Sequence, residues 1–292
     1  MSELRFSKMH GLGNDFVLID ARDPLPPTVA ADLPDLSRRL CDRHHGIGAD
    51  GLILLLPSPR ADVRMRIFNP DGSEAEMCGN GIRCLTAFAH ERGVSGNSMT
   101  VETGAGVLTP TLLGDGRVEV DMGPPILPAA QIPVRLTPTA PGDRVIDAEL
   151  DVDGETFAAT CVSMGNPHCV LFLDAQRGTS VDGVALNAIP IARLGPRIEQ
   201  HPAFPAHTNV EFAEITNRDE ITVVVWERGA GATLACGTGA CAAMVAASLT
   251  ARVGHRARVL LPGGVLEVEW REGGNAKMVG PFSHVYEGTF GA

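Results

Sequence analysis

Two cysteines stand at the start of two similar glycine-rich segments, and both are candidates for acid–base chemistry. The first segment reads Cys-Gly-Asn-Gly from Cys78, and the second reads Cys-Gly-Thr-Gly from Cys236. Residues that favour a helix follow each segment, so we expect both cysteines at helix N-termini. The free N–H groups and partial positive charge there bind anions and favour thiolate over thiol. Two such thiols indicate an acid–base pair rather than a single nucleophile.

The similarity extends to polar residues upstream of each cysteine. A Gly-Asn pair ends at Asn14, 64 residues before Cys78, and another ends at Asn166, 70 residues before Cys236. Asn69 and Glu227 each stand nine residues before their cysteine. Repeated spacings of this kind predict a duplicated pair of half-molecules.

Length and composition allow two ordinary domains and exclude several classes of function. The chain has 292 residues, 44% hydrophobic and 20% charged, which is typical of a globular protein. Its net charge of −11 argues against a nucleic-acid partner, because phosphate binding needs a basic surface. No apolar run is long enough to span a membrane, and the N-terminus has no signal-peptide core. We therefore expect a cytoplasmic protein with no membrane partner.

The seven cysteines do not suggest a metal site or a disulfide framework. Their spacings differ from the C-x-x-C pairs of zinc sites, so no metal is predicted. In the cytosol the thiols should remain reduced. Cys84 and Cys241 are expected to lie one to two turns into their helices and to face the protein core. The other three (Cys41, Cys161 and Cys169) are interpreted as small buried hydrophobic residues.

The order of expected elements predicts an α+β fold with two related halves. An amphipathic helix is predicted at 33–43, a helix from Cys78 to about Gly93, one near 184–194, and an alanine-rich helix over 239–252. Strands are predicted at 4–9, 16–20, 52–56, 63–69, 99–103, 107–113, 117–122, 145–152, 156–162, 169–173, 208–215, 220–226 and 279–290. The proline-rich stretch 124–141 is predicted to be the linker. The expected domains are 1–122, completed by 278–292, and 123–277, each with a helix enclosed by curled strands.

Other functions compete with the two-thiol interpretation. Residues 46–51 satisfy the dinucleotide pattern G-x-G-x-x-G, but they follow a helix and precede a strand, the reverse of the required order. A cysteine hydrolase could use His168 or His207 as its base, but it would leave the second Cys-Gly-x-Gly segment without a purpose. A binding protein for a dicarboxylic amino acid would use the helix starts only to hold carboxylates.

Four segments resemble the diaminopimelate epimerase family: 9–16 (MHGLGNDF), 69–83 (NPDGSEAEMCGNGIR), 164–168 (MGNPH) and 227–241 (ERGAGATLACGTGAC). The resemblance spans nearly the whole chain. It implies two pseudo-symmetric domains, each a mixed or antiparallel barrel-like sheet wrapped round a central helix, with the active site in the cleft between them. It also implies a homodimer and no pyridoxal phosphate or other cofactor. Two positions depart from the family pattern: many members have glutamine at Gly51 and glutamate at Ala232.

The resemblance implies a role for each matching residue in the interconversion of LL- and meso-diaminopimelate, a step towards lysine and peptidoglycan. Cys78 and Cys236 would exchange the α-proton as a thiolate–thiol pair. The other implied contacts are the backbone amides of Gly79, Asn80, Gly237 and Thr238 on the reacting carboxylate; Asn69, Asn209 and Arg228 on the distal end; Asn14 and Asn166 completing the pocket; and Glu227 and His168 on the reacting amine. The wider superfamily includes proline and hydroxyproline racemases, so a different small substrate also fits.

Overall fold

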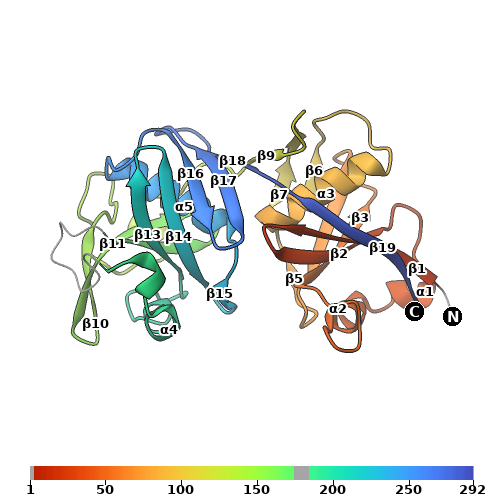
Figure 1. Ribbon diagram of the computed structural model, residues 1–292, viewed down its shortest axis with the longest axis horizontal. Coiled ribbons are helices and arrows are strands. Elements are labelled where there is room, and N and C mark those ends of the chain that lie inside the picture. Colours follow the sequence, from red (N-terminus) through yellow and green to blue (C-terminus); the bar gives the residue numbers. More distant parts are fainter. Residues whose placement is uncertain (1–2, 174–183, 292) are drawn as a thin grey trace. The chain divides into compact units, whose positions relative to one another are not determined.

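The computed structural model describes residues 3–173 and 184–291 and divides the chain into two compact units (Figure 1). The first unit comprises the chain up to Asp121 together with the segment from Val279 onward, and the second comprises Met122–Met278. Each unit contains one mixed sheet and one thirteen-residue helix that packs against several of its strands.

The first unit is built round α3. Its elements are β1 (Glu3–Gly11), β2 (Asn14–Asp20), α1 (Pro27–Ala30), α2 (Leu33–Cys41), β3 (Gly51–Leu56), β4 (Val63–Phe68), β5 (Glu74–Ala75), α3 (Gly79–Glu91), β6 (Val101–Thr103), β7 (Gly106–Leu108), β8 (Thr111–Leu112), β9 (Val118–Asp121) and β19 (Ser283–Gly291). The sheet order is β19-β1-β2-β3-β4-β6-β7, with β5 paired to β4. Helix α3 contacts β1 to β4 and the β8–β9 hairpin.

Helix α3 is buried from Gly79 to Ala89, so strands cover it on most sides rather than on one apolar face. The buried Arg83 is compatible with this position because its Nη1 donates to the Gly79 carbonyl and its Nη2 to Asn80 Oδ1. The helix ends at Glu91, and Gly93 follows with a φ of +86°, a left-handed conformation that favours glycine. The predicted end of this helix is therefore confirmed to within two residues.

The second unit is built in the same way round α5. Its elements are β10 (Ala148–Val152), β11 (Glu155–Ser163), β12 (Pro167–Phe172), α4 (Ile191–Glu199), β13 (Asn209–Asn217), β14 (Glu220–Glu227), β15 (Gly231–Thr233), α5 (Gly237–Leu249), β16 (Arg256–Leu261) and β17 (Gly264–Glu269), with 3₁₀ turns at Ala129–Gln131 and Leu186–Ala188. The sheet order is β10-β11-β12-β13-β14-β16-β17-β18, with β15 paired to β14. After β18 (Lys277–Gly280) the chain returns to the first unit.

The enclosure predicted for the alanine-rich helix is confirmed. Helix α5 contacts β11 to β14, β16 and β17, and its residues from Gly239 to Ala247 are all buried. Alanine suits this position because its small side chain lets strands approach the helix on several sides while keeping high helix propensity. The chain therefore has the predicted mixed α+β architecture. Neither sheet closes into a barrel within the described residues, because the first ends at β19 and β7 and the pairings of β10 join it only to β11.

The two sheets share one sequence of pairings. From β1 to β4 the pairings run antiparallel, parallel, antiparallel, and from β11 to β14 they do the same. Phe16 lies opposite Gly51 in the first parallel pair, and His168 lies opposite Asn209 in the second. Two residues after Gly51 in β3 comes Ile53, and two residues after Asn209 in β13 comes Glu211, so these two residues occupy equivalent positions. Local comparison between the units is therefore possible residue by residue.

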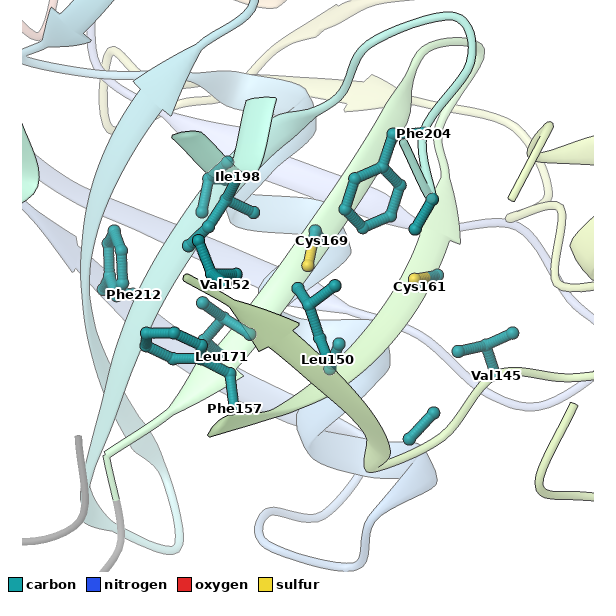
Figure 2. Packing of buried hydrophobic residues seen from close by; sticks show 14 of the residues in the cluster. Val145, Leu150, Val152, Phe157, Cys161, Cys169, Leu171, Ile198, Phe204 and Phe212 are labelled. Carbon is teal, nitrogen blue, oxygen red and sulfur yellow. The ribbon is translucent and has the colours of Figure 1, made fainter. Parts of the chain in front are cut away.

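A large apolar core packs on the face of the second sheet that carries alternate residues of β12 and β13 (Figure 2). Cys161 and Cys169 are opposite each other in β11 and β12 and lie inside this core as free thiols, which confirms their interpretation as small buried residues. The stretch 124–141 also contributes buried side chains, among them Ile132 and Val134. The prediction that this stretch is a linker is therefore wrong, since its apolar residues are part of the core.

Other differences from the predicted elements have local causes. The helix predicted at 184–194 is instead a 3₁₀ turn followed by α4. Pro190 separates the two because it holds Ile189 in an extended conformation (ψ 124°). The strand predicted at 279–290 is interrupted by Pro281 between β18 and β19, and the hairpin β16–β17 was not predicted. Among the described residues, no helix is both long enough and apolar enough to cross a membrane.

Candidate active site

Each candidate cysteine is the N-cap of a central helix, as the sequence predicts. Cys78 has extended backbone angles (φ −141°, ψ 121°) and its Sγ accepts a hydrogen bond from Gly81 N at 3.5 Å. Cys236 has similar angles (φ −118°, ψ 114°), and its Sγ accepts from Gly239 N at 3.3 Å. In this position a sulfur faces the positive end of the helix, where the first backbone N–H groups of the helix also point. Both helix starts are therefore suited to binding an anion such as a carboxylate.

Asparagine side chains surround the first cysteine. Asn14 Oδ1 lies 3.7 Å from Cys78 Sγ and accepts a hydrogen bond from Asn80 Nδ2 at 3.2 Å. The other end of the Asn14 amide donates to Asp50 Oδ2 at 3.0 Å. Asp50 thus fixes which end of Asn14 faces the sulfur. The structure brings Asn14, Asn80 and Cys78 together, as the sequence predicts, and adds Asp50, which was not predicted.

Asp50 is held in place by Arg43, which also binds Asp15. Arg43 Nη2 donates to Asp15 Oδ1 at 2.8 Å and to Asp50 Oδ1 at 2.7 Å, and Lys8 Nζ lies 2.5 Å from Asp15 Oδ2. Burial alone would raise the pKa of Asp15, but the hydrogen bonds from Arg43 and Lys8 outweigh it and lower the pKa to about 2. Asp15 is therefore ionised at neutral pH and stabilises the start of β2.

The second cysteine lies in a different environment. Its side chain is 6% exposed, whereas Cys78 is partly exposed. Thr238 Oγ1 lies 3.4 Å from Cys236 Sγ and accepts a hydrogen bond from Asn166 Nδ2 at 3.3 Å. Burial raises the pKa of the Cys236 thiol well above its usual value, and the nearby carboxylates of Glu227 and Glu211 raise it further. Hydrogen bonds from Thr238 and Gly239 oppose this shift. In this state the sulfur favours the thiol.

A buried histidine–glutamate pair lies next to the second cysteine. His168 Nδ1 and Glu211 Oε1 are 2.6 Å apart, and both side chains are fully buried. His168 Nε2 contacts Asn166 Oδ1 at 3.0 Å. Both ring nitrogens of His168 thus have partners other than the Cys236 sulfur, which does not favour the cysteine–histidine hydrolase. His207, the other base considered, is exposed and its Nδ1 lies 3.9 Å from Glu199 Oε1.

Glu211 is the residue of this region that the sequence interpretation missed. It stands in β13 between Val210 and Phe212, and burial raises its pKa. The available signal was a carboxylate inside a strand that is buried on both faces, since such a group costs free energy unless it is paired. Its partner His168 belongs to another strand, so the sequence alone could not show the pairing.

The remaining candidates form smaller groups. Asn209 Nδ2 donates to the Pro167 carbonyl at 2.8 Å, and its Oδ1 accepts from Arg228 N at 2.9 Å. The Arg228 guanidinium is exposed and donates to the Ala206 carbonyl at 3.0 Å. Glu227 Oε1 accepts from Thr233 Oγ1 at 2.5 Å. Asn69, in the first unit, donates to Ser73 Oγ at 2.9 Å. Asn209 and Arg228 are therefore neighbours, as a shared role in binding requires.

The two departures from the family pattern lie in the sheets. A side chain on Gly51 would begin 3.0 Å from the Phe68 carbonyl oxygen and 3.3 Å from the Phe16 ring, so the local packing suits glycine. Ala232 is exposed on β15 opposite Trp226 in β14. Within the described residues, no group of three or more His, Cys, Asp or Glu side chains is arranged to hold a metal ion.

Comparison with known proteins identifies the family. The model of the diaminopimelate epimerase family matches residues 6–128 and 160–285. The diaminopimelate epimerase of Moorella thermoacetica is 50% identical over 98% of this chain and 99% of its own length, and that of a Synechocystis species is 52% identical over 98% of both. The chain belongs to the diaminopimelate epimerase family. A hydroxyproline epimerase from Agrobacterium vitis, only 19% identical, has the same fold (TM-score 0.67, covering 98% of this chain and 92% of that one).

Membership in the diaminopimelate epimerase family agrees with the two N-capping cysteines. Its members in the comparison include a protein of rice chloroplasts, 49% identical over 98% of this chain and 80% of its own. A shared architecture alone decides less, since the hydroxyproline epimerase has the fold with a different substrate in its name. The family, rather than the fold, thus points to the substrate.

Proposed function

We propose that this chain interconverts LL- and meso-diaminopimelate in lysine and peptidoglycan precursor biosynthesis, using two cysteines and no cofactor. The observation that carries the proposal is the pair of N-capping sulfurs, Cys78 and Cys236, at equivalent positions of two repeated units. An isomerisation that inverts one carbon needs a base on one face and an acid on the other, and a duplicated thiol provides both. The family identity supplies the substrate.

In the proposed reaction one cysteine acts as thiolate and the other as thiol. The thiolate takes the α-proton, the electron pair of the broken C–H bond remains on the carbon and its carboxylate, and the opposed thiol donates its proton to the other face. Each turnover thus exchanges the protonation states of Cys78 and Cys236. The high pKa of the Cys236 thiol suits the state in which that residue is the acid. Substrate binding must shift the balance for the reverse reaction.

The negative charge that develops on the substrate needs donors already in place. We assign this role to the backbone amides of Gly79, Asn80, Gly237 and Thr238, which lie in the first turns of α3 and α5. The N–H groups in the first turn of a helix point out of its N-terminus, at the positive end of the helix dipole. Fixed donors of this kind stabilise a developing oxyanion without reorganisation.

The other polar residues are assigned to substrate recognition. Asn69, Asn209 and Arg228 would bind the distal amino-acid end, where the exposed Arg228 guanidinium can hold a carboxylate with two parallel hydrogen bonds. Asn14 and Asn166 would complete the pocket beside Cys78 and Thr238 respectively. Glu227 and His168 would contact the reacting amine, as the family resemblance implies.

The direct test follows the stereochemistry and the α-proton together. Reduced, purified protein is incubated with LL-diaminopimelate in D₂O, and the stereoisomers and deuterium content are measured with time. We expect the meso isomer to form with deuterium at the inverted carbon. Absence of both isomerisation and exchange in folded, reduced protein would contradict the proposal. Proline and hydroxyproline, tested in parallel, would reveal a racemase of another substrate, and tight binding without exchange would indicate a binding protein.

We also propose that the protein is a cytoplasmic homodimer. The structure has all seven cysteines as thiols rather than disulfides. The proposed reaction needs Cys78 and Cys236 reduced, which favours a reducing compartment. Strand β19 is an edge strand, and its Val285 and Tyr286 are 54% and 45% exposed, which is typical of a surface that pairs with another chain. Light scattering coupled to gel filtration should give the mass of two chains, and Tyr286→Asp should reduce it. A monomeric wild type would contradict the assembly.

A further inference from the structure

A continuous series of polar contacts in the second unit connects a buried carboxylate with the Cys236 sulfur. Glu211 Oε1 contacts His168 Nδ1 at 2.6 Å, and His168 Nε2 contacts Asn166 Oδ1 at 3.0 Å. Asn166 Nδ2 donates to Thr238 Oγ1 at 3.3 Å, and Thr238 Oγ1 lies 3.4 Å from Cys236 Sγ. Of these residues the family resemblance gave a role to all except Glu211.

The donors and acceptors along this series place a hydrogen on His168 Nε2. Asn166 directs its amide N–H group to Thr238, so its oxygen faces the imidazole and must accept a hydrogen bond. On the other side of the ring, Glu211 Oε1 lies 2.6 Å from Nδ1, so one hydrogen bond joins these two atoms. Glu211 thus holds the ring in the orientation that presents Nε2–H to Asn166.

The equivalent positions of the first unit show that the fold does not require this pair. Phe16 occupies the position of His168, and Ile53 occupies that of Glu211. An added methyl on Gly81 would lie 2.9 Å from Ile53 Cδ1, and one on Gly239 would lie 2.8 Å from Glu211 Oε1, so the two side chains lie in the same place beneath their helices. An apolar pair fills that place in one unit. The polar pair in the other unit therefore needs a different explanation.

The buried polar pair also has a cost in free energy. Glu211 is fully buried, and its Oε2 has no hydrogen-bond partner among the described residues. Buried ion pairs are often less stable than well-packed hydrophobic replacements, and an oxygen without a partner adds to the cost. Groups retained at such a cost in one of two otherwise similar packing arrangements are candidates for function.

We propose that Glu211 is a positioning residue for the reaction: it holds the His168 ring with Nε2–H toward Asn166, so that His168 fixes Asn166 and Asn166 fixes the Thr238 hydroxyl against Cys236. The proposal rests on the function proposed above. Thr238 Oγ1 accepts from Asn166 in every state, so its own hydrogen is free to rotate. It donates to Sγ when Cys236 is a thiolate, and Oγ1 accepts from Sγ–H when Cys236 is a thiol. Both states of the cycle thus keep a hydrogen bond without moving a heavy atom.

The test measures the protonation of His168 directly by ¹⁵N NMR of the histidine ring, without substrate, alongside steady-state kinetics. In the wild type at pH 7 to 8 we expect His168 Nε2 to carry a hydrogen. Glu211→Gln keeps the size of the side chain and replaces the carboxyl group that bonds Nδ1, so the ring signals of His168 should shift. We expect kcat to fall about ten- to a hundredfold, by analogy with the loss when the outer hydrogen-bond partner of a metal-binding histidine is removed, with a smaller change in KM.

Glu102→Gln is a matched control. Glu102 is a nearly buried carboxylate in the first unit that contacts Arg60 and Ser58, outside the proposed site. This variant should leave the His168 signals and kcat unchanged, which separates loss of one buried charge in general from loss of Glu211.

A wild-type His168 without a hydrogen on Nε2 would overturn the proposal, and so would a Glu211→Gln variant with unchanged ring signals. A kcat within about twofold of wild type in that variant would likewise reject the positioning role. Because the NMR measurement uses no substrate, it also separates this inference from the proposed function. A His168 with a hydrogen on Nε2 and ring signals that depend on Glu211, in a protein without epimerase activity, would reject the reaction and leave the network.

Discussion

The starts of α3 and α5 have the same backbone arrangement, but they differ in where apolar and polar side chains lie around it. At α3 the side chains beneath the helix are apolar, Phe16 and Ile53, and the charges lie outside, where Asp50 and its neighbours orient Asn14. At α5 polar side chains lie beneath the helix as the pair His168–Glu211. The backbone repeat therefore needs neither arrangement in particular.

The difference shows which features serve the fold and which serve chemistry. Both units share the N-capping cysteine, the glycine three residues after it and the enclosed helix. These shared features are what the architecture and the proposed pair of thiols require. Features present in only one unit distinguish the two thiols. Cys78 is partly exposed and contacts asparagine, whereas Cys236 is buried near carboxylates. We therefore expect the two cysteines to differ in acidity and in their response to substitution.

The largest expected effect comes from removing either sulfur. Cys78→Ala or Cys236→Ala should lower the rate of epimerisation by about 10²- to 10⁴-fold or more, because each loses the acid in one direction and the base in the other. The measurement is meso-isomer formation from LL-diaminopimelate by chiral chromatography, with circular dichroism to confirm folding. Substantial activity in either variant would defeat the two-thiol mechanism.

The helices themselves provide controls for the cysteine variants. Cys84 lies one to two turns into α3, and Cys241 lies in the equivalent part of α5. Burial raises the pKa of the Cys84 thiol to about 12, so this group stays protonated and unreactive at neutral pH. Cys84→Ala and Cys241→Ala should therefore keep epimerase activity.

The next largest effect is on stability, when the His168–Glu211 pair is replaced by the apolar residues at the equivalent positions of the first unit. His168→Phe alone leaves Glu211 buried without its partner, which should destabilise the protein by about 3–5 kcal/mol. Adding Glu211→Ile gives the apolar pair of the first unit, and this double variant should recover the lost stability or exceed the wild type. Urea denaturation of the three proteins gives the comparison. A double variant no more stable than His168→Phe would show that the two units do not pack equivalently here.

The pH dependence sharpens that comparison. Burial raises the pKa of Glu211 above its ordinary value of 4.5. A carboxyl group whose pKa is higher in the folded state binds more protons there, so its contribution to stability falls as pH rises from about 4.5. The double variant should therefore gain most over the wild type near neutral pH and least below pH 4.5. Stability curves with a constant difference across this range would contradict the cause assigned here.

The sequence was sufficient to predict the features that both units share. The Cys-Gly-x-Gly segments predicted two helix starts, and the structure has helices from Gly79 and Gly237. The alanine content of 239–252 predicted an enclosed helix, which is confirmed. These predictions succeed because they depend on local signals, such as a cap, glycine and small residues, that lie next to one another in the chain.

The features missed by the sequence interpretation depend on partners distant in the chain. Glu211 looks like an ordinary strand residue until β12 and β13 pair in parallel and bring His168 beside it. The proline-rich stretch 124–141 has the composition of a linker, and only the folded structure shows that its Ile132 and Val134 are part of the core. The helix predicted at 184–194 is wrong for a local reason, because Pro190 keeps Ile189 out of the helical conformation despite the apolar pattern.

A smaller effect is expected at the third residue after the N-cap cysteine of each helix. Gly239→Ala would place a methyl 2.8 Å from Glu211 Oε1, which His168 holds in position, so we expect a loss of about 1–3 kcal/mol. Gly81→Ala would meet Ile53 Cδ1 at 2.9 Å and Met65 Cε at 3.2 Å, the flexible ends of two side chains. Alanine also gains about 1 kcal/mol of helix propensity over glycine, so this variant should be near neutral. Equal melting temperatures for the two variants would contradict the difference assigned to Glu211.

The smallest expected effect comes from replacing Asp15, one of the charged residues near the start of β2 in the first unit. The pKa of Asp15 is about 2 in the folded protein, below its ordinary value of 3.8, so its ionised form stabilises the fold. That contribution is complete above pH 4 and is lost as pH falls towards 2. Asp15 is partly exposed, so we expect it to amount to on the order of 1 kcal/mol after solvent screening. Asp15→Asn should therefore lower the melting temperature at pH 6 and have little effect near pH 2. In the second unit Pro167 occupies the position equivalent to Asp15, so that position has no carboxylate. An Asp15→Asn protein with wild-type stability at pH 6 would therefore mean that the start of β2, like that of β12, is held by backbone pairing alone.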